Sequence, residues 1–471
     1  MMKASCQTRR TQGRVCCVLS VVCVLAGVVS PALAQPSPPA FPITLQDAIR
    51  YASDNYPAIR AAQARVSAQE SGVDLAQTSY LPRVDSSLQI NRATRNNVAG
   101  LLLPGTTIPP ISGPVSDETS WSSIWGSGAG VLVSWEAFDF GQRGASVDLA
   151  RTLVVRANAG ADVARLDVAV KTGDAFLRLA AAQETVRAAR GNVDRQQVFA
   201  NAVAALVKNQ LRPGADDSRA QAEFALARIQ VIQAEQAEQV ARASLAQWLG
   251  VRPTDVQITG ALLLQTPPPA PAGPPPVATH PVAEAQMAAV ESSLALQHVL
   301  GRSYAPRIHV QTAYSWRGTG ATANGTHLGG SHGLDFDTPN WALGFTATFP
   351  LFDWFSLRER TRIEEHNERA ERATYDRIVQ ELSAQTEQAR AEMDGARRVA
   401  ENTPIQLQAA RVLEQQSRAR YDAGLATIIE VADSQRLLLQ AEVGDALARL
   451  GVWRARLADA AAKGDISELL K

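Results

Sequence analysis

Four segments of the chain alternate between apolar and polar positions with a period of two, which is the pattern of a β-strand with two unlike faces. In the third segment, Val310, Tyr314 and Trp316 alternate with polar or small residues. Each segment is about 9 to 11 residues long, enough for a tilted strand to cross a bilayer. A soluble β-sandwich gives the same alternation, so the pattern alone does not decide between the two. The predicted strands span about 84–93, 128–136, 307–317 and 340–350.

Aromatic residues near the ends of these segments favour the membrane alternative, because aromatic girdles mark both interfaces of outer-membrane barrels. Long loops rich in Gly, Pro, Ser and Thr lie inside each strand pair, at about 95–124 and 318–339, as on the extracellular side of such barrels. Four strands cannot close a barrel, since the smallest bacterial ones have about eight. We therefore predict a barrel shared between subunits. The predicted aromatic girdle comprises Trp125, Trp135, Trp316, Trp341 and Phe349.

Most of the remaining chain is alanine-rich and has the spacing of long helices. Two segments, about 142–208 and 356–421, each exceed 60 residues, so each can reach ~100 Å at 1.5 Å per residue. Because no globular domain accommodates helices of this length, we expect them to pair with each other and with shorter helices. A plain coiled-coil protein would share this pattern but would lack the strands. The shorter predicted helices span about 44–80, 216–249, 282–304 and 427–461.

The chain contains two copies of one unit. Ser79–Val84 and Ser303–Ile308 share four of six residues, and each lies between a helical segment and an alternating one. A Phe-Asp pair closes the second strand of each copy, at Asp139 and Asp353. A proline-rich stretch separates the copies and reads as an extended connector. We predict a first repeat at 35–264, a linker at 265–280 and a second repeat at 281–471.

Glycine turns end both long helical segments. Gly214 in the first copy and Gly424 in the second are each followed by about 35 helical residues. The distance from the Phe-Asp pair to the glycine is 76 residues in the first copy and 72 in the second. The two arms are therefore predicted to differ by about one helical turn.

The N-terminal residues predict a secretory leader. Four basic residues precede an apolar run at 15–29, and Ala32–Ala34 provides a small-residue cleavage site. A transmembrane anchor, the alternative, needs about 20 apolar residues, more than this run contains. We predict a signal peptide at 1–34 and a mature chain that begins at Gln35. All four cysteines lie within the leader, so the mature chain would carry neither a disulfide nor an N-terminal lipid.

Charge and motif content exclude several function classes. Loss of the leader leaves 42 basic against 46 acidic residues, a net charge of −4, which suggests no nucleic-acid partner. The sequence has no zinc-protease pair, phosphate-binding glycine loop or nucleophile elbow, so we predict no catalytic site and no cofactor. The glycine run at 126–130 is placed in the approach to a strand. His327 and His332 share one loop, but without a third ligand they predict no metal site.

The order and spacing of these features resemble those of TolC-like outer-membrane efflux proteins. The resemblance rests on Ile43–Ala48, Asn55–Ile59, the two Phe-Asp strand ends, the glycine turns and the doubled layout, and it covers nearly the whole mature chain. It implies a homotrimer in which each chain gives four strands to a 12-stranded barrel in outer-membrane lipid, above a periplasmic tube of 12 helices. It also implies a periplasmic adaptor and an inner-membrane pump as partners.

The predicted fold class is therefore mainly α with a membrane β-barrel, and the predicted function is passive export through a tripartite efflux or secretion system. The alternatives are a periplasmic coiled-coil adaptor or structural protein, which would lack membrane strands, and an enzyme, which would need a site that the sequence does not show. The cargo stays open, because a wide duct leaves selectivity to the pump.

The resemblance implies two sites at the far end of the helices. The turn of the second copy, with Gly214 as its counterpart in the first, would dock adaptor hairpins. Glu430 and Asp433, three residues apart on one helix face, would line the periplasmic gate. A helix cap at the turn and a solvated helix face are the ordinary alternatives. The predicted docking residues of the second turn are Gly424, Leu425, Ala426 and Thr427, where Ala426 replaces a basic residue that some members carry.

Overall fold

The computed structural model describes residues 41–94, 121–260, 263, 265, 277–322 and 328–469. The predicted leader with its cleavage site, most of the loop at 95–124, the centre of the proline-rich linker and His327 lie outside these residues. Helices dominate the described part, and they are joined to one four-stranded antiparallel sheet. The predicted fold class, mainly α with a small sheet, is confirmed.

Seven α-helices are described, and their bounds follow from proline and cap positions. The sequence predicted one helix at 44–80, whereas the structure has two, because Tyr56 adopts an extended conformation (φ −65°, ψ 135°) before Pro57. A residue that precedes proline is disfavoured in the helical region. The helices are α1 (Leu45–Asn55), α2 (Pro57–Thr78), α3 (Gln142–Lys208), α4 (Gly214–Leu249), α5 (Pro281–Arg302), α6 (Trp354–Asp422) and α7 (Ile428–Lys463), with short 3-10 turns η1 (Pro253–Asp255), η3 (Val277–Thr279) and η4 (Ser467–Leu469).

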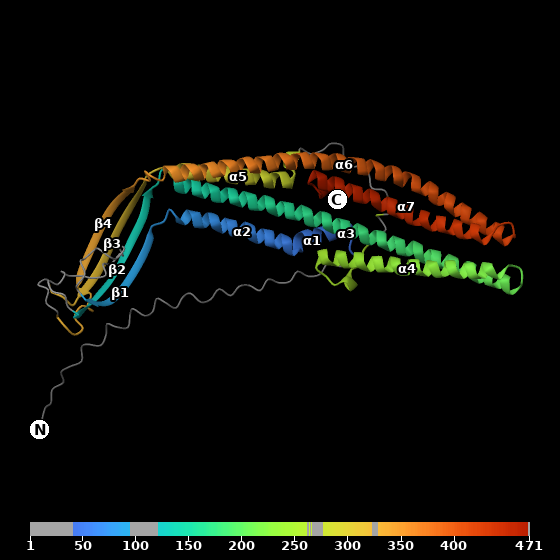
Figure 1. Cartoon of the computed structure of the whole chain (residues 1–471), viewed down its shortest axis with the longest axis horizontal. Helices are drawn as coiled ribbons and strands as arrows, with labels where there is room; N and C mark the ends of the chain where they lie inside the picture. The colour runs from blue at the N-terminus through green and yellow to red at the C-terminus, as the bar shows by residue number, and fades with distance from the viewer. Residues whose placement is uncertain are drawn as a thin grey trace, which may run out of the picture. The chain divides into compact units, whose positions relative to one another are not determined.

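The sheet runs in the order β1-β2-β3-β4, with every neighbouring pair antiparallel (Figure 1). The strand β2 is longer than the predicted segment at 128–136 and contains the whole glycine run at 126–130, which the sequence analysis had placed in the approach to the strand. The four strands are β1 (Arg83–Thr94), β2 (Ser123–Phe138), β3 (Arg307–Thr319) and β4 (Thr338–Thr348).

The register brings the apolar positions of all four strands to one face. Tyr314 lies opposite Val131 on one side and opposite Trp341 on the other. Residues directly opposite one another in adjacent strands share a face, so the apolar face continues from β1 to β4. Leu132 is apolar but lies opposite Asp85, so it belongs to the other, mainly polar face.

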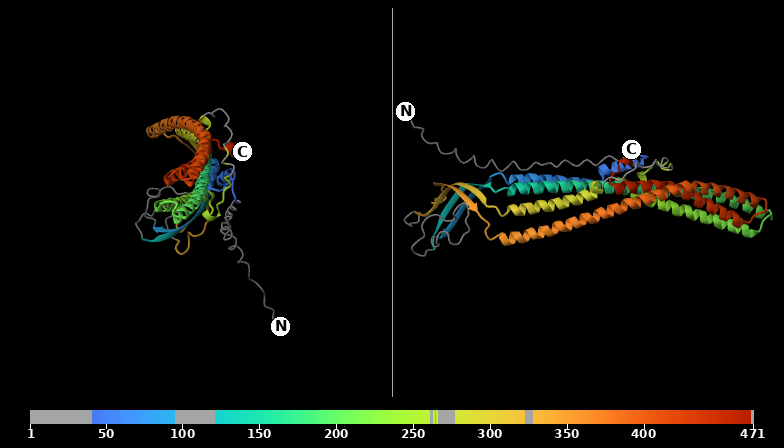
Figure 2. Two further views of the ribbon diagram at one scale, coloured as in Figure 1. Left: turned by 90° about the vertical axis from the view of Figure 1, so that its right-hand side faces the viewer. Right: turned by 90° about the horizontal axis from the view of Figure 1, so that it is seen from above.

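Each long helix is paired along its length with shorter ones. The helix α3 packs against α1 and α2 in one half and α4 in the other, and α6 packs in the same way against α5 and α7 (Figure 2). The largest buried cluster includes Phe176 and Leu179 of α3, Leu245 of α4 and Leu450 of α7. Among the described helices, none combines the length and the apolar character that a membrane-spanning helix requires.

Candidate functional site

The α6–α7 turn is closed by a glycine and a threonine cap. Gly424 has a φ of +75°, a left-handed conformation that glycine adopts without cost and that commonly ends a helix. Thr427 is the N-cap of α7 and accepts a hydrogen bond from the Glu430 N–H. Between them, Ala426 is buried, whereas Leu425 is 71% exposed. The predicted docking residues therefore form one turn, with a single large apolar side chain on its surface.

The α3–α4 turn has the same geometry without a glycine. Gln210 takes the left-handed position, with a φ of +63°, and Gly214 is the first residue of α4, after the N-cap Pro213. The counterpart of Gly424 is thus Gln210. Measured to these residues, each arm spans 71 residues, from Asp139 and from Asp353 respectively. The predicted difference of one helical turn was wrong, because Gly214 marks a different position from Gly424.

A tyrosine connects the two turns, and the sequence analysis did not identify it. The Tyr421 hydroxyl donates to Asp216 Oδ2 (3.1 Å), and Arg212 Nη2 donates to the Tyr421 carbonyl oxygen (2.5 Å). The Arg212 guanidinium also lies 4.3 Å from the centre of the Tyr421 ring. Tyr421 itself is 1% exposed and packs edge-on against Phe199. These contacts hold the α3–α4 hairpin to the α6–α7 hairpin within one protomer.

The same surroundings keep the phenol protonated. Burial, followed by the hydrogen bond and negative charge of Asp216, raises the pKa of Tyr421 to about 12. Ionisation would place a second negative charge beside Asp216 in a poorly solvated position. The link between the hairpins is therefore intact at all physiological pH values.

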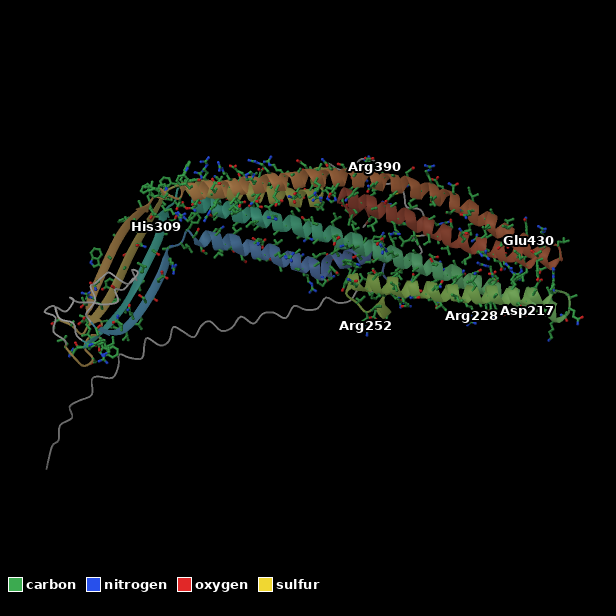
Figure 3. The ribbon with its side chains drawn as sticks, viewed as in Figure 1. Asp217, Arg228, Arg252, His309, Arg390 and Glu430 are labelled. Atoms are coloured by element: carbon green, nitrogen blue, oxygen red, sulfur yellow. The ribbon has the colours of Figure 1, made fainter. Side chains whose placement is uncertain are left out.

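Both predicted gate acids have partners in their own protomer. Glu430 accepts from the Thr427 N–H at 3.1 Å, which completes a capping box, and lies 3.8 Å from Arg420. Asp433 pairs with Arg436 at 3.4 Å, and Arg436 also reaches Glu223 of α4 at 3.7 Å. Both carboxylates are exposed at the start of α7, where Figure 3 labels Glu430. Glu430 thus stabilises the helix start, and its place at a gate stays a prediction.

The predicted girdle residues lie at two levels of the sheet. Trp125 and Trp316 lie toward the loop ends of their strands, and Arg92 lies 5.1 Å from the Trp125 ring. Trp341 is nearest to this level, opposite Tyr314. Trp135 and Phe349 lie near the helices, where the Trp135 indole N–H donates to the Tyr80 carbonyl oxygen at 3.0 Å. Their spacing fits two interfaces, which stays a prediction.

The junction of β2 with α3 is closed by a buried ion pair. The Asp139 carboxylate accepts from the Gly141 N–H (3.1 Å) and from Arg143 N (2.6 Å) and Nε (3.0 Å). Burial alone would raise the pKa of Asp139, but the hydrogen bonds and charge of Arg143, together with the Gly141 N–H, hold that pKa below its usual value. Arg143 also donates to the Ser79 carbonyl oxygen and lies 4.8 Å from the centre of the Tyr80 ring.

Metal ligands do not gather in the part of the chain that the structure describes: no group of three or more His, Cys, Asp or Glu side chains occurs there. His332 is exposed, and its predicted loop neighbour His327 lies outside the described residues.

Comparison with known proteins assigns the family. The model of the outer membrane efflux protein family matches residues 48–251 and 280–462. The chain is 24% identical to protein CyaE of Bordetella pertussis over 457 residues, which cover 93% of this chain and 89% of that protein.

Solved structures share the fold. The outer-membrane channel OprN is 20% identical, with a TM-score of 0.71 over 89% of each chain. The MtrE outer-membrane channel of Neisseria gonorrhoeae, in its open state, is 18% identical, with a TM-score of 0.68 over 89% of each chain. The CmeC outer-membrane channel of Campylobacter jejuni is 14% identical, with a TM-score of 0.71 over 89% of this chain and 85% of that one. The chain belongs to the outer membrane efflux protein family and is an outer-membrane channel protein rather than an enzyme.

Proposed function

We propose that three copies of the chain form one duct, with a 12-stranded barrel in the outer membrane and a periplasmic tube of 12 helices, through which an inner-membrane pump and a periplasmic adaptor export cargo passively. The number three comes from the family resemblance. The observation that carries the proposal is the open sheet, which has an apolar face and two unpaired edge strands among the described residues.

The open sheet cannot lie in a bilayer by itself. The edges of β1 and β4 leave backbone N–H and C=O groups without strand partners. In hydrocarbon, each such group costs several kcal/mol. Only a closed barrel removes both edges. The apolar face, which includes Trp341 at 78% exposure, fits the lipid side.

The helices carry a second surface suited to self-association. Ile405, Val412 and Leu413 are exposed on one face of α6, beside a shallow groove of about 700 Å³ that begins at Pro404. A matching apolar stripe on α4 comprises Leu226, Ile229 and Ile232. Such stripes at helical spacing are expected to pack against helices of a neighbouring copy.

Both turns are proposed to dock the adaptor. The register of the turns makes Leu211 the counterpart of Leu425, and these leucines are 67% and 71% exposed. The position equivalent to Gly424 is Gln210 rather than Gly214, and both are followed by a leucine. Single exposed leucines on adjacent turns suit the apolar contacts of a helical hairpin.

Native mass spectrometry of the protein in a mild detergent tests the assembly. We expect a mass of three chains, each beginning at Gln35 without a lipid. Val412→Asp with Leu413→Asp should shift the mass toward monomer, because two charges would be buried in the interface. The matched control is Arg411→Asp, an exposed neighbour outside the groove. A well-folded wild-type monomer would refute the shared barrel.

The gate is tested separately by planar-bilayer conductance. Glu430→Gln with Asp433→Asn keeps the capping hydrogen bonds but removes six carboxylates per trimer. A ring of carboxylates attracts cations, so we expect lower cation selectivity and weaker block by a trivalent cation from the periplasmic side. Unchanged selectivity with intact trimers would place these acids on the solvated outer surface.

A further inference from the structure

The junctions between sheet and helices differ between the two repeats, although their backbones correspond. Pro82 corresponds to Pro306 and Asp139 to Asp353, so Arg143 corresponds to Leu357. In the first repeat the Arg143 side chain is 12% exposed and joins Asp139, Tyr80 and the Ser79 carbonyl. In the second repeat Leu357 is buried and cannot make these contacts. The space beside it is a cavity of about 780 Å³.

Two arginines line this cavity without a carboxylate partner. Arg83, in the first repeat, pairs with Asp85 at 2.9 Å. Its counterpart Arg307 has His309 at the equivalent position, and within the described residues neither Arg307 nor Arg360 forms an ion pair. The strand β3 carries both Arg307 and His309, and Figure 3 shows His309 where the sheet meets the helices.

The other lining groups also favour an anion. The N-terminus of α6 opens on the cavity, and its cap residue Asp353 makes no side-chain hydrogen bond to the helix. The free N–H groups and the dipole of a helix start stabilise negative charge. Asp353 is the one carboxylate among the lining residues, against two guanidiniums. Glu136, which faces His309 across the strand pair, is not among them.

The cavity has an apolar wall beside these cations. Leu351 and Phe352 follow β4 and line one side, and both are largely exposed. Arg307, His309 and Thr348 belong to the polar face of the sheet, which borders the water-filled interior in the proposed barrel. A ligand that fits both walls has an oxyanion at one end and an apolar body at the other.

We propose that this cavity, between β3, β4 and the N-termini of α3 and α6, binds amphiphilic organic anions from the duct, with Arg307 and Arg360 on the oxyanion and Leu351 and Phe352 on the apolar body. The site deepens the proposed function, on which it rests, by naming a class of cargo that the duct wall retains. Each trimer holds three such sites at one level of the duct.

Isothermal titration of the purified protein in maltoside detergent with dodecyl phosphate tests the site. We expect Arg307→Gln with Arg360→Gln to weaken binding by about tenfold or more, because the double variant removes both cations that bind the oxyanion. Arg358→Gln, an exposed neighbour that does not line the cavity, should leave binding unchanged.

Further ligands identify what is recognised. Inorganic phosphate should bind more weakly than dodecyl phosphate, and dodecyltrimethylammonium should not bind at the site. The proposal would be overturned if dodecyltrimethylammonium bound as tightly as dodecyl phosphate, or if the double arginine variant bound dodecyl phosphate as tightly as the wild type. Nanodiscs rich in phosphatidylglycerol should not displace the probe, and displacement would assign the site to membrane lipid instead. Native mass spectrometry of every variant distinguishes a lost site from a lost trimer.

Discussion

In the first repeat, an arginine at the junction with the sheet and another in the turn bind neighbouring elements, whereas the second repeat has apolar residues at the same two positions. At the junction with the sheet, Arg143 corresponds to Leu357, and in the turn, Arg212 corresponds to Ala426. Each arginine crosses to another element, Arg143 to the end of α2 and Arg212 to the C-terminus of α6. The two repeats thus share backbone geometry at both ends, while the arginine contacts present at these ends of the first repeat are absent from the second.

The largest effect is expected when the first junction is given the residue of the second. Arg143→Leu leaves Asp139 buried without its cation, and breaking a buried pair in this way costs about 3–5 kcal/mol. Chemical denaturation in detergent measures the loss. Arg151→Leu, which breaks an exposed pair with Asp148, should cost less than about 1 kcal/mol. Similar losses in both variants would show that the junction is not a special anchor.

The Asp139 pair also predicts a pH dependence. Because the folded-state pKa of Asp139 lies below its unfolded value, its stabilisation is present above about pH 4, the pKa of an unperturbed aspartate, and is lost as the pH falls through the lower folded pKa. Asp139→Asn should lose this acid-sensitive part of the stability. An identical pH profile in wild type and variant would contradict the assignment.

A smaller effect is expected from the bond between the turns. Tyr421→Phe removes the donor to Asp216 and should cost about 1.5–3 kcal/mol, the contribution of a bond to a charged group. In wild type, stability should also fall as the pH rises from about 10, the unperturbed tyrosine value, through about 12 in the folded state. Hydrogen exchange of the backbone amides at 209–212 reports the loosening of the turn. Tyr375→Phe, which removes no described hydrogen bond, is the control.

Exchanging the left-handed residues tests whether the turns are equivalent. Gly424→Gln places a side chain in a conformation that costs about 1–2 kcal/mol. Gln210→Gly should be neutral or stabilise by up to about 1 kcal/mol, because it relieves the same cost. Thermal unfolding of the two variants and the double variant measures both. A loss of stability in Gln210→Gly would mean that the Gln210 side chain holds its turn in another way.

The smallest effect on stability is expected at the exposed leucines. Leu211→Ala and Leu425→Ala should each change stability by less than about 0.5 kcal/mol, because both side chains are largely in solvent. Binding of the cognate adaptor, measured by surface plasmon resonance, should weaken in both if the turns dock equally. Weakening in one variant alone would assign docking to that turn.

Local pattern predicted the elements better than the contacts between them. Alternation identified the strands because their faces meet different surroundings, and the Phe-Asp pairs marked where long helices begin. The break before Pro57 was visible in the sequence and was overlooked. Gln210 had no local signal, since a left-handed glutamine is uncommon. The link from Tyr421 to Asp216 spans 205 residues, and nothing within either segment indicates it.

The open sheet also constrains how the protein is made. Before the proposed trimer forms, each chain has an apolar face and two unpaired strand edges among its described residues, the arrangement that leads to sheet-to-sheet aggregation in water. In that assembly, membrane insertion and oligomerisation are expected to occur together, because only closure of the barrel removes both edges. The yield of refolded channel then depends on the relative rates of barrel closure and of non-native strand pairing. It falls as the concentration of free chain rises.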